Sequence, residues 1–460
     1  MPPTAALESM DSDTVPTSNA LWQPWMVCFS ASLLFFFIFI QVNMFNALDP
    51  ALITAFHVSA VELGDLSASY FYACVIFLFP AGMILDRVST RAVIIFATAL
   101  AVVATFGFAA ATTVWQAEVC RFLVGVCGAF CFLSNVRLAS RWFKPQRLAL
   151  VIGLIVTLAM VGGMIAQTPF TLLTDHLGWR MAVMIDGTMG LFILVVIVLF
   201  VKDFPPDYAA LHEQEQQSLR GAGFWSTLYR VIKNSQNWLA GLYTSLMNLP
   251  IFLLGAMWGS IYLVQIRDLT RPEASLVTTM LFVGVVVGSP TVGWISDRLH
   301  NRRVPMLIGA LVSFIFICLL IYTSYLSMFY LLLLFFAIGF ITSTQIISYP
   351  LIVESNPSSL TGTSEGLASV LIMAGGFTQP LFAELMELHW GHQYINHLPV
   401  YSLSNYRIAL AIMPIAFLLA LLIALLIRET HCTPYDKNYQ DESVGQLLMG
   451  DIDAEQCDQY

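Results

Sequence analysis

One arginine of this chain, Arg121, lies well inside a long apolar stretch. A charged side chain in such surroundings is costly unless it faces a polar cavity or a partner, so Arg121 is a candidate functional residue. Its planar guanidinium can hold two oxygens of a carboxylate or a phosphate at once. We expect Arg121 to bind an anionic solute or to take part in proton coupling. The structural alternative is an ion pair with Glu118, which lies one helical turn earlier.

Further polar side chains are embedded in other apolar stretches. Amides and hydroxyls there can orient a polar solute by hydrogen bonds, or they can join neighbouring helices instead. A carboxylate in the same surroundings, Asp186, is a candidate for carrying a proton. The amide and hydroxyl candidates are Asn43, Asn46, Asn248, Gln345 and Tyr349.

The composition shows which environment these residues occupy. Of the 460 residues, 58% are hydrophobic and 11% are charged. A soluble globular domain has about 45–50% apolar and about 25% charged residues, so this chain must be solvated by lipid. The formal net charge of −9 argues against a nucleic-acid partner, which would require a clustered basic face.

Twelve stretches are long enough to cross a bilayer, which takes about 20 mostly apolar residues in a helix. They predict an all-α membrane protein with twelve transmembrane helices. The expected spans are residues 24–48, 65–84, 92–111, 117–138, 147–171, 180–201, 237–265, 273–295, 304–325, 328–352, 363–387 and 406–428.

One long polar connection separates the first six spans from the last six. Its second part places Phe224 and Trp225 beside Arg230 and Lys233, a pattern typical of a helix lying on the membrane surface. The predicted organisation is a cytoplasmic tail (1–23), a six-helix bundle (24–201), a cytoplasmic linker with an interfacial helix (202–236), a second six-helix bundle (237–428) and an acidic cytoplasmic tail (429–460).

Basic residues are concentrated in alternate connections. With a cytoplasmic N-terminus, fifteen of the twenty Lys and Arg residues fall on the inner side and four on the outer side, and Arg121 lies within a span. The positive-inside rule therefore places both termini in the cytoplasm. We expect a multi-pass protein of a bacterial inner membrane.

An internal repeat relates the two halves. Residues 82–87 and 293–298 both read Gly-x-x-x-Asp-Arg and are followed by further arginines, at an offset of 211 residues. A second pair of glycine patterns, starting at Gly153 and Gly366, has an offset of 213 residues. The repeat predicts two pseudo-symmetric six-helix bundles, an arrangement that builds transporters with a central site between the halves.

These motifs resemble a known family. The two Gly-x-x-x-Asp-Arg loops are similar to the inner-loop signature of the major facilitator superfamily. The segment 121–125 (Arg-Phe-Leu-Val-Gly) resembles that family's fourth-helix arginine motif, and Gly178-Trp179-Arg180 is common before its sixth helix. The resemblance covers about residues 22–430. It implies a secondary transporter that works by alternating access and needs no bound cofactor.

The chain departs from the family pattern at two places. Ser89-Thr90 stand where the first loop usually has Gly and a basic residue, and the fifth span lacks the Gly-Pro pair of many proton-coupled drug antiporters. The run from Gly162-Gly163 to Pro169 and the terminus from Arg428-Glu429-Thr430 to Cys432 are similar to a branch of phagosomal nutrient importers from intracellular bacteria.

The resemblance implies a gate at the cytoplasmic mouth. There the carboxylates of the two loops would meet the starts of the eleventh and fifth spans, where the helix dipole favours negative charge. The neighbouring arginines would bridge to carboxylates across the gap while the inner side is closed. The expected gate residues are Asp86, Arg87, Arg91, Asp297, Arg298, Arg303 and Glu365.

In the same family the spans that carry Asn43, Asn46, Asn248, Gln345 and Tyr349 line the central cavity, whereas the span that carries Asp186 lies at the periphery of its bundle. We therefore expect the solute and coupling site to comprise these amides and Tyr349 together with Arg121 and Glu118, with Asp186 as a further coupling candidate. The three outer-loop histidines, His389, His392 and His397, fit no standard zinc spacing, so we expect no metal site.

The leading hypothesis is a secondary active transporter of a small polar organic solute, such as an amino acid, a nucleoside or an organic acid, working as a monomer by symport with protons. The first alternative is an exporter of a drug or a metal chelator by proton antiport. A membrane sensor or polytopic enzyme is a third class. It is less favoured because the chain shows neither a soluble output domain nor clustered catalytic groups.

Overall fold

A computed structural model describes residues 18–143, 145–205, 224–323, 326–356, 361–388, 390–391, 394–395 and 398–433. Within these ranges, twelve helical segments are long and apolar enough to cross a membrane, which confirms the predicted number of spans. The outer-loop residues His389, His392 and His397 lie outside the described residues, as does most of the predicted linker.

The first half consists of α1 (Ser18–Asn43), α2 (Phe45–Phe56), α3 (Ala60–Arg87), α4 (Thr90–Ala110), α5 (Val114–Trp142), α6 (Pro145–Ile165), α7 (Thr168–Leu177) and α8 (Trp179–Phe200). Side chains at the turns fix where these helices begin. Ser59 and Glu62 form a reciprocal capping box before α3, and the Ser89 hydroxyl accepts a hydrogen bond from the backbone of Ala92 in α4.

The second half begins with the helix expected before the seventh span, α10 (Phe224–Lys233). It continues with α11 (Ser235–Met247), η1 (Ile251–Gly255), α12 (Gly259–Arg267), α13 (Arg271–Leu299), α14 (Arg303–Tyr322), α15 (Met328–Thr342), η2 (Ser343–Ile347), α16 (Ser348–Glu354), α17 (Thr361–Ala374), η4 (Gly375–Phe377), α18 (Thr378–Glu387), β1 (Tyr394–Ile395), β2 (Leu398–Pro399), α19 (Leu403–Leu410) and α20 (Ile412–Leu426). The antiparallel pair β1–β2 is the single departure from all-α structure among the described residues.

The helix of the seventh span is broken in its middle. Pro250 follows the end of α11, and proline cannot continue a regular helix because it lacks a backbone N–H and its ring clashes with the preceding turn. The chain winds instead into the wider turn η1 before α12 resumes the helix. The break leaves the carbonyls of Leu254, Gly255 and Ala256 available to side chains and backbone groups of the first half.

The two halves repeat the same close helix pairing, α3 with α5 and α13 with α15. A Cβ atom on Gly125 would lie 2.2 Å from the carbonyl oxygen of Tyr70, and one on Gly339 would lie 1.9 Å from that of Leu281. Only glycine fits at such an approach of two backbones. These glycines are 214 residues apart, close to the offset of the sequence repeat, so they occupy equivalent places in a duplicated bundle.

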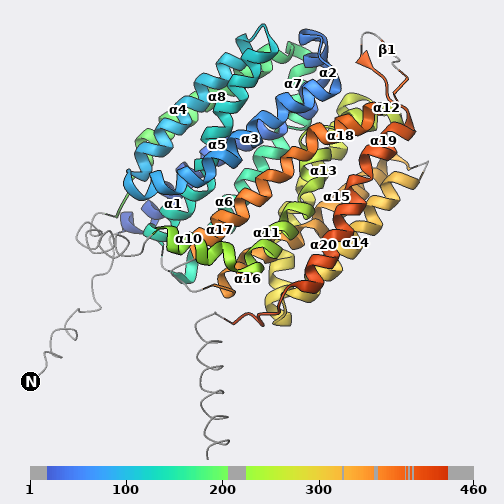
Figure 1. Cartoon of the computed structure of the whole chain (residues 1–460). Coiled ribbons are helices and arrows are strands. Elements are labelled where there is room, and N and C mark those ends of the chain that lie inside the picture. Colours follow the sequence, from blue (N-terminus) through green and yellow to red (C-terminus); the bar gives the residue numbers. More distant parts are fainter. Residues whose placement is uncertain are drawn as a thin grey trace, which may run out of the picture.

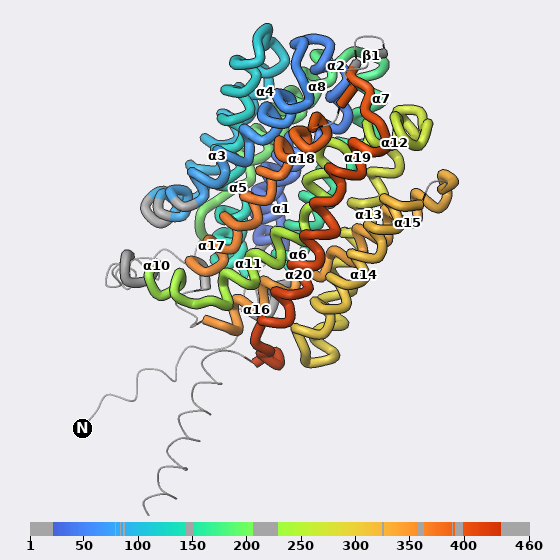
Figure 2. Tube along the Cα trace, turned by 45° about the vertical axis from the view of Figure 1, so that its right-hand side comes forward, coloured from blue at the N-terminus to red at the C-terminus, as the bar shows by residue number. Residues whose placement is uncertain are grey.

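The helices of the two halves lie side by side along their length (Figure 1). Across the boundary α3 packs against α17 and α18, and α6 packs against α13. Figure 1 shows α2, α7, α12 and α19 at one end of the molecule, called here the α2–α12 end. Helices α10 and α16 lie at the other end, the α10–α16 end, and Figure 2 shows the same arrangement after a 45° turn.

Candidate functional site

Arg121 lies inside the first half with 1% of its surface exposed. Its Nη1 donates to the carbonyl oxygen of Gln41 on α1 at 2.7 Å. The guanidinium carbon stands 4.6 Å from the ring centre of Phe45 and 5.5 Å from that of Tyr70. The Nε and Nη2 atoms are buried without a hydrogen-bond partner in the described part of the chain. Two donors of a buried cation are therefore left to bind another group.

The predicted ion pair with Glu118 is not formed. Glu118 lies on the same helix but is half-exposed, and no salt bridge joins it to Arg121. The buried guanidinium interacts instead with α1 and with the two aromatic rings. The prediction failed because helical spacing alone does not show which of two nearby side chains turns toward the bundle interior.

Helix α8 is the least buried of the twelve spans, as expected of a peripheral helix, but Asp186 itself lies on its inner face and is buried. Its Oδ2 accepts a hydrogen bond from the Gln41 side chain, while Oδ1 has no partner in the described structure. Gln41 therefore links Asp186 to Arg121, through its amide on one side and its backbone carbonyl on the other. Sequence reasoning did not select Gln41, although an amide among apolar residues of the first span was an available signal.

The remaining predicted polar residues occupy separate places. Asn43 donates to the carbonyl of Phe39 one turn earlier, and its Oδ1 is unpartnered. Gln345 is buried in η2, and its Oε1 has no partner in the described structure. The ring of Tyr349 on α16 lies near that of Phe132 of the first half, with 6.2 Å between the ring centres. Asn248 is half-buried at the break of the seventh span. Their contact with a solute stays a prediction.

Asn46 is an interface residue that binds the broken helix of the second half. Its Nδ2 donates to the carbonyl oxygens of Leu254 and Gly255, each at 2.8 Å. Its Oδ1 accepts from the backbone of Ser260 at 2.8 Å, and its own N–H donates to Ala256. The side chain expected to bind a solute is therefore fully used in joining the two halves.

Gln167 continues this interface between α6 and α7. It accepts from Asn46 Nδ2 at 3.0 Å and from Thr278 Oγ1 at 2.7 Å, and it donates to Gly255 O at 2.8 Å. We call the whole contact region the α2–α12 seam. It comprises Asn46, Ala47, Asp49, Gln167, Thr168 and Asp175 of the first half and Leu254–Ala256, Ser260, Arg271, Ser275, Thr278 and Thr279 of the second.

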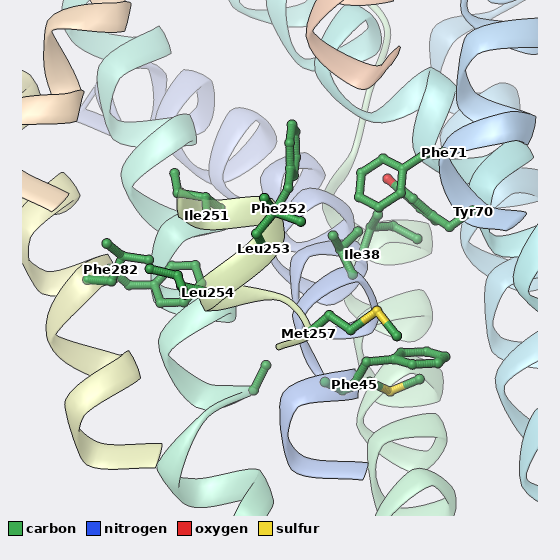
Figure 3. Close-up of a cluster of buried hydrophobic side chains, with 14 of the residues drawn as sticks. Ile38, Phe45, Tyr70, Phe71, Ile251, Phe252, Leu253, Leu254, Met257 and Phe282 are labelled. Carbon is green, nitrogen blue, oxygen red and sulfur yellow. The ribbon is translucent and has the colours of Figure 1, made fainter. Parts of the chain in front are cut away.

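An apolar layer packs the two halves together beside the seam. The rings of Phe71 and Phe252, one from each half, pack edge to face with their centres 5.1 Å apart. Figure 3 shows these rings together with Tyr70, Phe45 and Met257. Phe45 and Tyr70 are also the rings beside Arg121. The molecule is thus closed at the α2–α12 end, with the buried arginine next to the closing layer.

Removing the Asn46 side chain should open this seam. Each buried hydrogen bond contributes about 0.5–1.5 kcal/mol. Loss of the three bonds from Asn46 to the second half should therefore shift the closed-to-open ratio by about tenfold or more. We expect Asn46→Ala to raise the thiol-labelling rate of a Ser260→Cys reporter in purified protein accordingly. Asn43→Ala is the matched control, because the Asn43 side chain bonds only within its own helix. An equal rate rise in both variants would contradict the assignment.

At the α10–α16 end the predicted cross-gap pairs of the second half are not formed in this conformation, and they stay a prediction for the state in which that end is closed. Arg298 stacks on Trp294 of its own helix at 5.2 Å, and Arg303 donates to carbonyls at the end of α20. The residue that binds carboxylates is Arg302, which reaches Asp297 at 2.6 Å and Glu354 of α16 at 2.7 Å. All of these contacts lie within the second half, because the short α13–α14 turn directs Arg302 inward and leaves Arg298 on the surface.

In the first half, Arg91 also bonds within its own half, to Asp203 through its backbone and to the Val198 carbonyl through its side chain. Arg91 therefore does not bridge the gap in this conformation, and its part in the closed cytoplasmic gate stays a prediction. The side chains of Asp86 and Arg87 lie outside the described residues. Glu365 is half-buried near the start of α17, and its role at the gate stays a prediction.

A carboxylate after the last span of each half caps the start of an earlier helix in that half. Asp203 accepts from the backbone of Arg91 at the start of α4, and Glu429 accepts from the backbones of Arg302 and Arg303 at the start of α14. Partial burial raises the pKa of Glu429, but the backbone hydrogen bonds outweigh it and lower the pKa overall. The loops before α4 and α14 are thus held by carboxylates at equivalent places in the two halves.

The similarity of this chain to known proteins extends over most of its length. A family model described as the Major Facilitator Superfamily matches residues 31–270 and 244–445. The D-galactonate transporter of Escherichia coli O6:H1 (strain CFT073) is 24% identical over 365 residues, covering 73% of this chain and 83% of the relative. The membrane sensor protein UhpC of Escherichia coli (strain K12) is 24% identical over 382 residues, covering 76% and 82%.

A solved structure has the same fold. A bacterial homolog of the human lysosomal transporter Spinster, in an inward-facing and unoccupied conformation, superposes with a TM-score of 0.69 at 14% sequence identity. The match covers 91% of this chain and 98% of that one.

Proposed function

The chain belongs to the major facilitator superfamily, and from that premise we propose that it is a secondary active transporter that moves a small organic carboxylate together with protons. The observation that carries the proposal is the pair of unpartnered donors, Nε and Nη2, on the fully buried Arg121. A cation buried in this way in a membrane bundle is costly unless an anion pairs with it.

The shape of the free edge favours a planar anion with two oxygens. Nε and Nη2 lie side by side on one edge of the guanidinium, and Nη1 on the far side is occupied by Gln41. Two parallel hydrogen bonds from such an edge fit a carboxylate, and they are stronger than neutral bonds because both groups are charged. Phe45 and Tyr70 would flank the bound group. The name of one relative, a D-galactonate transporter, supports a carboxylate as the solute class.

Asp186 supplies a candidate for proton coupling. It is buried with one unpartnered oxygen, and no basic side chain contacts it in the described structure. An ionised carboxylate there is an uncompensated buried charge. Binding or release of a proton at Asp186 would therefore change the free energy of the packed bundle strongly. Gln41 would carry that change to Arg121, since it bonds to both.

The orientation follows the distribution of basic residues. Most of the arginines and lysines of the connections fall at the α10–α16 end, which we propose to be cytoplasmic together with both termini. Closure at the α2–α12 end is then closure toward the outside. We propose uptake by a monomer in a bacterial inner membrane.

The experiment is flux into proteoliposomes made with the purified protein. We expect labelled sugar acids and other small carboxylates to enter faster when the outside is more acidic than the inside, and nucleosides, which carry no carboxylate, to compete poorly. Gradient-driven uptake of a neutral nucleoside that carboxylates do not inhibit would overturn the solute class.

A sensor is the second candidate, because UhpC is a membrane sensor by name and covers a similar share of the chain. A sensor of this fold would bind its ligand without moving it. Saturable carboxylate binding to the purified protein, combined with no flux of any bound carboxylate, would favour the sensor over the transporter.

A further inference from the structure

One carboxylate of the α2–α12 seam has no part in the proposed solute site. Asp49 lies on α2, beyond the end of the first span at Asn43, and none of its surface is exposed. Neither of its oxygens has a hydrogen-bond partner in the described structure. An ionised carboxylate buried without such partners is far more costly than the neutral acid.

The charges around Asp49 do not balance when it is ionised. Arg271 of α13 attracts it, but Arg271 also pairs with Asp175 of α7 and donates to the carbonyl of Ala47 at 2.7 Å. One arginine thus serves two carboxylates. The Asp175 side chain is 27% exposed and can remain ionised in water, whereas Asp49 is sealed.

Among the described residues, Tyr406 of α19 also lies within electrostatic range of Asp49, and it donates its hydroxyl hydrogen to Gln265. It contributes no positive charge to the closed seam. A proton on Asp49 therefore leaves the group of Arg271, Asp175 and Asp49 neutral, and loss of that proton leaves it with a net negative charge.

A cavity of about 120 Å³ lies between α2 and the second half, and its lining includes Asn46 and Pro50 of α2, Ser260 and Arg271, but not Asp49 itself. A buried water takes about 30 Å³ of liquid volume, so the cavity can hold a few waters beside Arg271. Opening of the seam would give this water access to Asp49.

We propose that Asp49 is a proton-binding site that controls the α2–α12 seam: the seam closes when Asp49 holds a proton and opens when it releases one. The inference rests on the proposed alternating access, but it concerns the gate rather than the solute site. Because the seam seals Asp49 from the α10–α16 end, this proton sets the conformation and is not the one transported.

The direction of the pH effect follows from burial. Desolvation raises the pKa of Asp49 in the closed seam well above its usual range, and the charge of Arg271 opposes this only in part. When the seam opens, the exposed carboxyl returns to a pKa of about 3.9. Protonation therefore stabilises the closed form fully below that value, and this stabilisation is lost as the pH rises through the raised pKa.

The test is thiol labelling of a Ser260→Cys reporter in purified detergent-solubilised protein, with the parent protein as background. Ser260 lines the cavity and is 5% exposed. Each labelling rate is divided by that of free cysteine at the same pH, because the reactive thiolate fraction itself rises with pH. We expect this relative rate to be about tenfold or more higher at pH 8 than at pH 5, since one unit of pKa difference corresponds to a tenfold change in population. With Asp49→Asn added, which mimics the protonated acid, labelling should be slow at both pH values.

Two further variants test whether the pH response of labelling is specific to Asp49. Asp268→Asn removes an equal charge from an exposed position near the same end, so its labelling should keep the pH response of the parent. Asp175→Asn frees Arg271 for Asp49, so labelling should stay slow at pH 8. A pH response that survives Asp49→Asn unchanged would overturn the proposal, as would a flat response in the parent.

Thermal unfolding at pH 5 and pH 8 checks that Asp49→Asn is folded. We expect its Tm to exceed that of the parent at pH 8, and a Tm lower than the parent's at both pH values would also contradict the proposal. None of these measurements involves solute. A protein that fails to transport carboxylates can still show the pH response of labelling, and absence of this pH response would not contradict carboxylate flux.

Discussion

Arg121→Lys should abolish most carboxylate uptake while leaving the protein folded. Lysine keeps the positive charge but cannot present two parallel donors to one carboxylate. A hydrogen bond to a charged group contributes about 1.5–3 kcal/mol, so loss of one should raise KM about 10- to 150-fold. The measurement is initial uptake of a labelled sugar acid into proteoliposomes over a range of concentrations.

Arg180→Lys is the matched control for Arg121→Lys. Arg180 donates to the carbonyls of Ala109 and Ala111 at the end of α4, and its position is exposed. We expect near-parental uptake from it. If Arg121→Lys transports as well as this control, Arg121 is a structural residue and the proposed solute site is wrong.

Asp186→Asn should separate solute movement from the proton gradient. Asparagine keeps the shape of the protonated acid and can still bond to Gln41, but it cannot release a proton. We therefore expect carboxylate exchange between the two sides of the vesicle at nearly the parental rate, with no accumulation when the outside is made acidic. Counterflow and gradient-driven uptake, measured on the same vesicles, distinguish these two activities.

The control for Asp186→Asn is Asp268→Asn, which changes an exposed carboxylate of the second half. This variant should accumulate solute like the parent. Full gradient-driven accumulation by Asp186→Asn would assign coupling to another group, and loss of both activities would show that Asp186 serves folding or solute binding instead.

The buried seam and the proposed solute site differ in how they could be found from sequence. Arg121 was identifiable because a cation among apolar residues is rare and expensive. The amide of Asn46 looked the same as that of Asn43, yet one joins the two halves and the other bonds to its own helix. Pro250 was an available signal of a broken helix, but the carbonyls that it exposes could be assigned to Asn46 only in three dimensions.

Charged residues at the α10–α16 end show the same limit. The repeated loop motif correctly marked where arginines and carboxylates concentrate, but not which arginine bonds to which carboxylate. Arg302, adjacent to the predicted Arg303, makes the contact with Glu354. Neighbouring residues point in different directions around a helix start, so a one-position difference decides between an ion pair and a carbonyl contact.

The sequence by itself determined the lipid environment, the twelve spans and the duplicated architecture. These properties follow from local composition, because each span must satisfy its own backbone in lipid and needs a fixed length of apolar residues. Only the tertiary structure decided which polar groups meet. Asn46 and Leu254 are 208 residues apart, and Gln41 and Asp186 are 145 apart. Such contacts depend on how packed helices are rotated against one another, which local composition does not set.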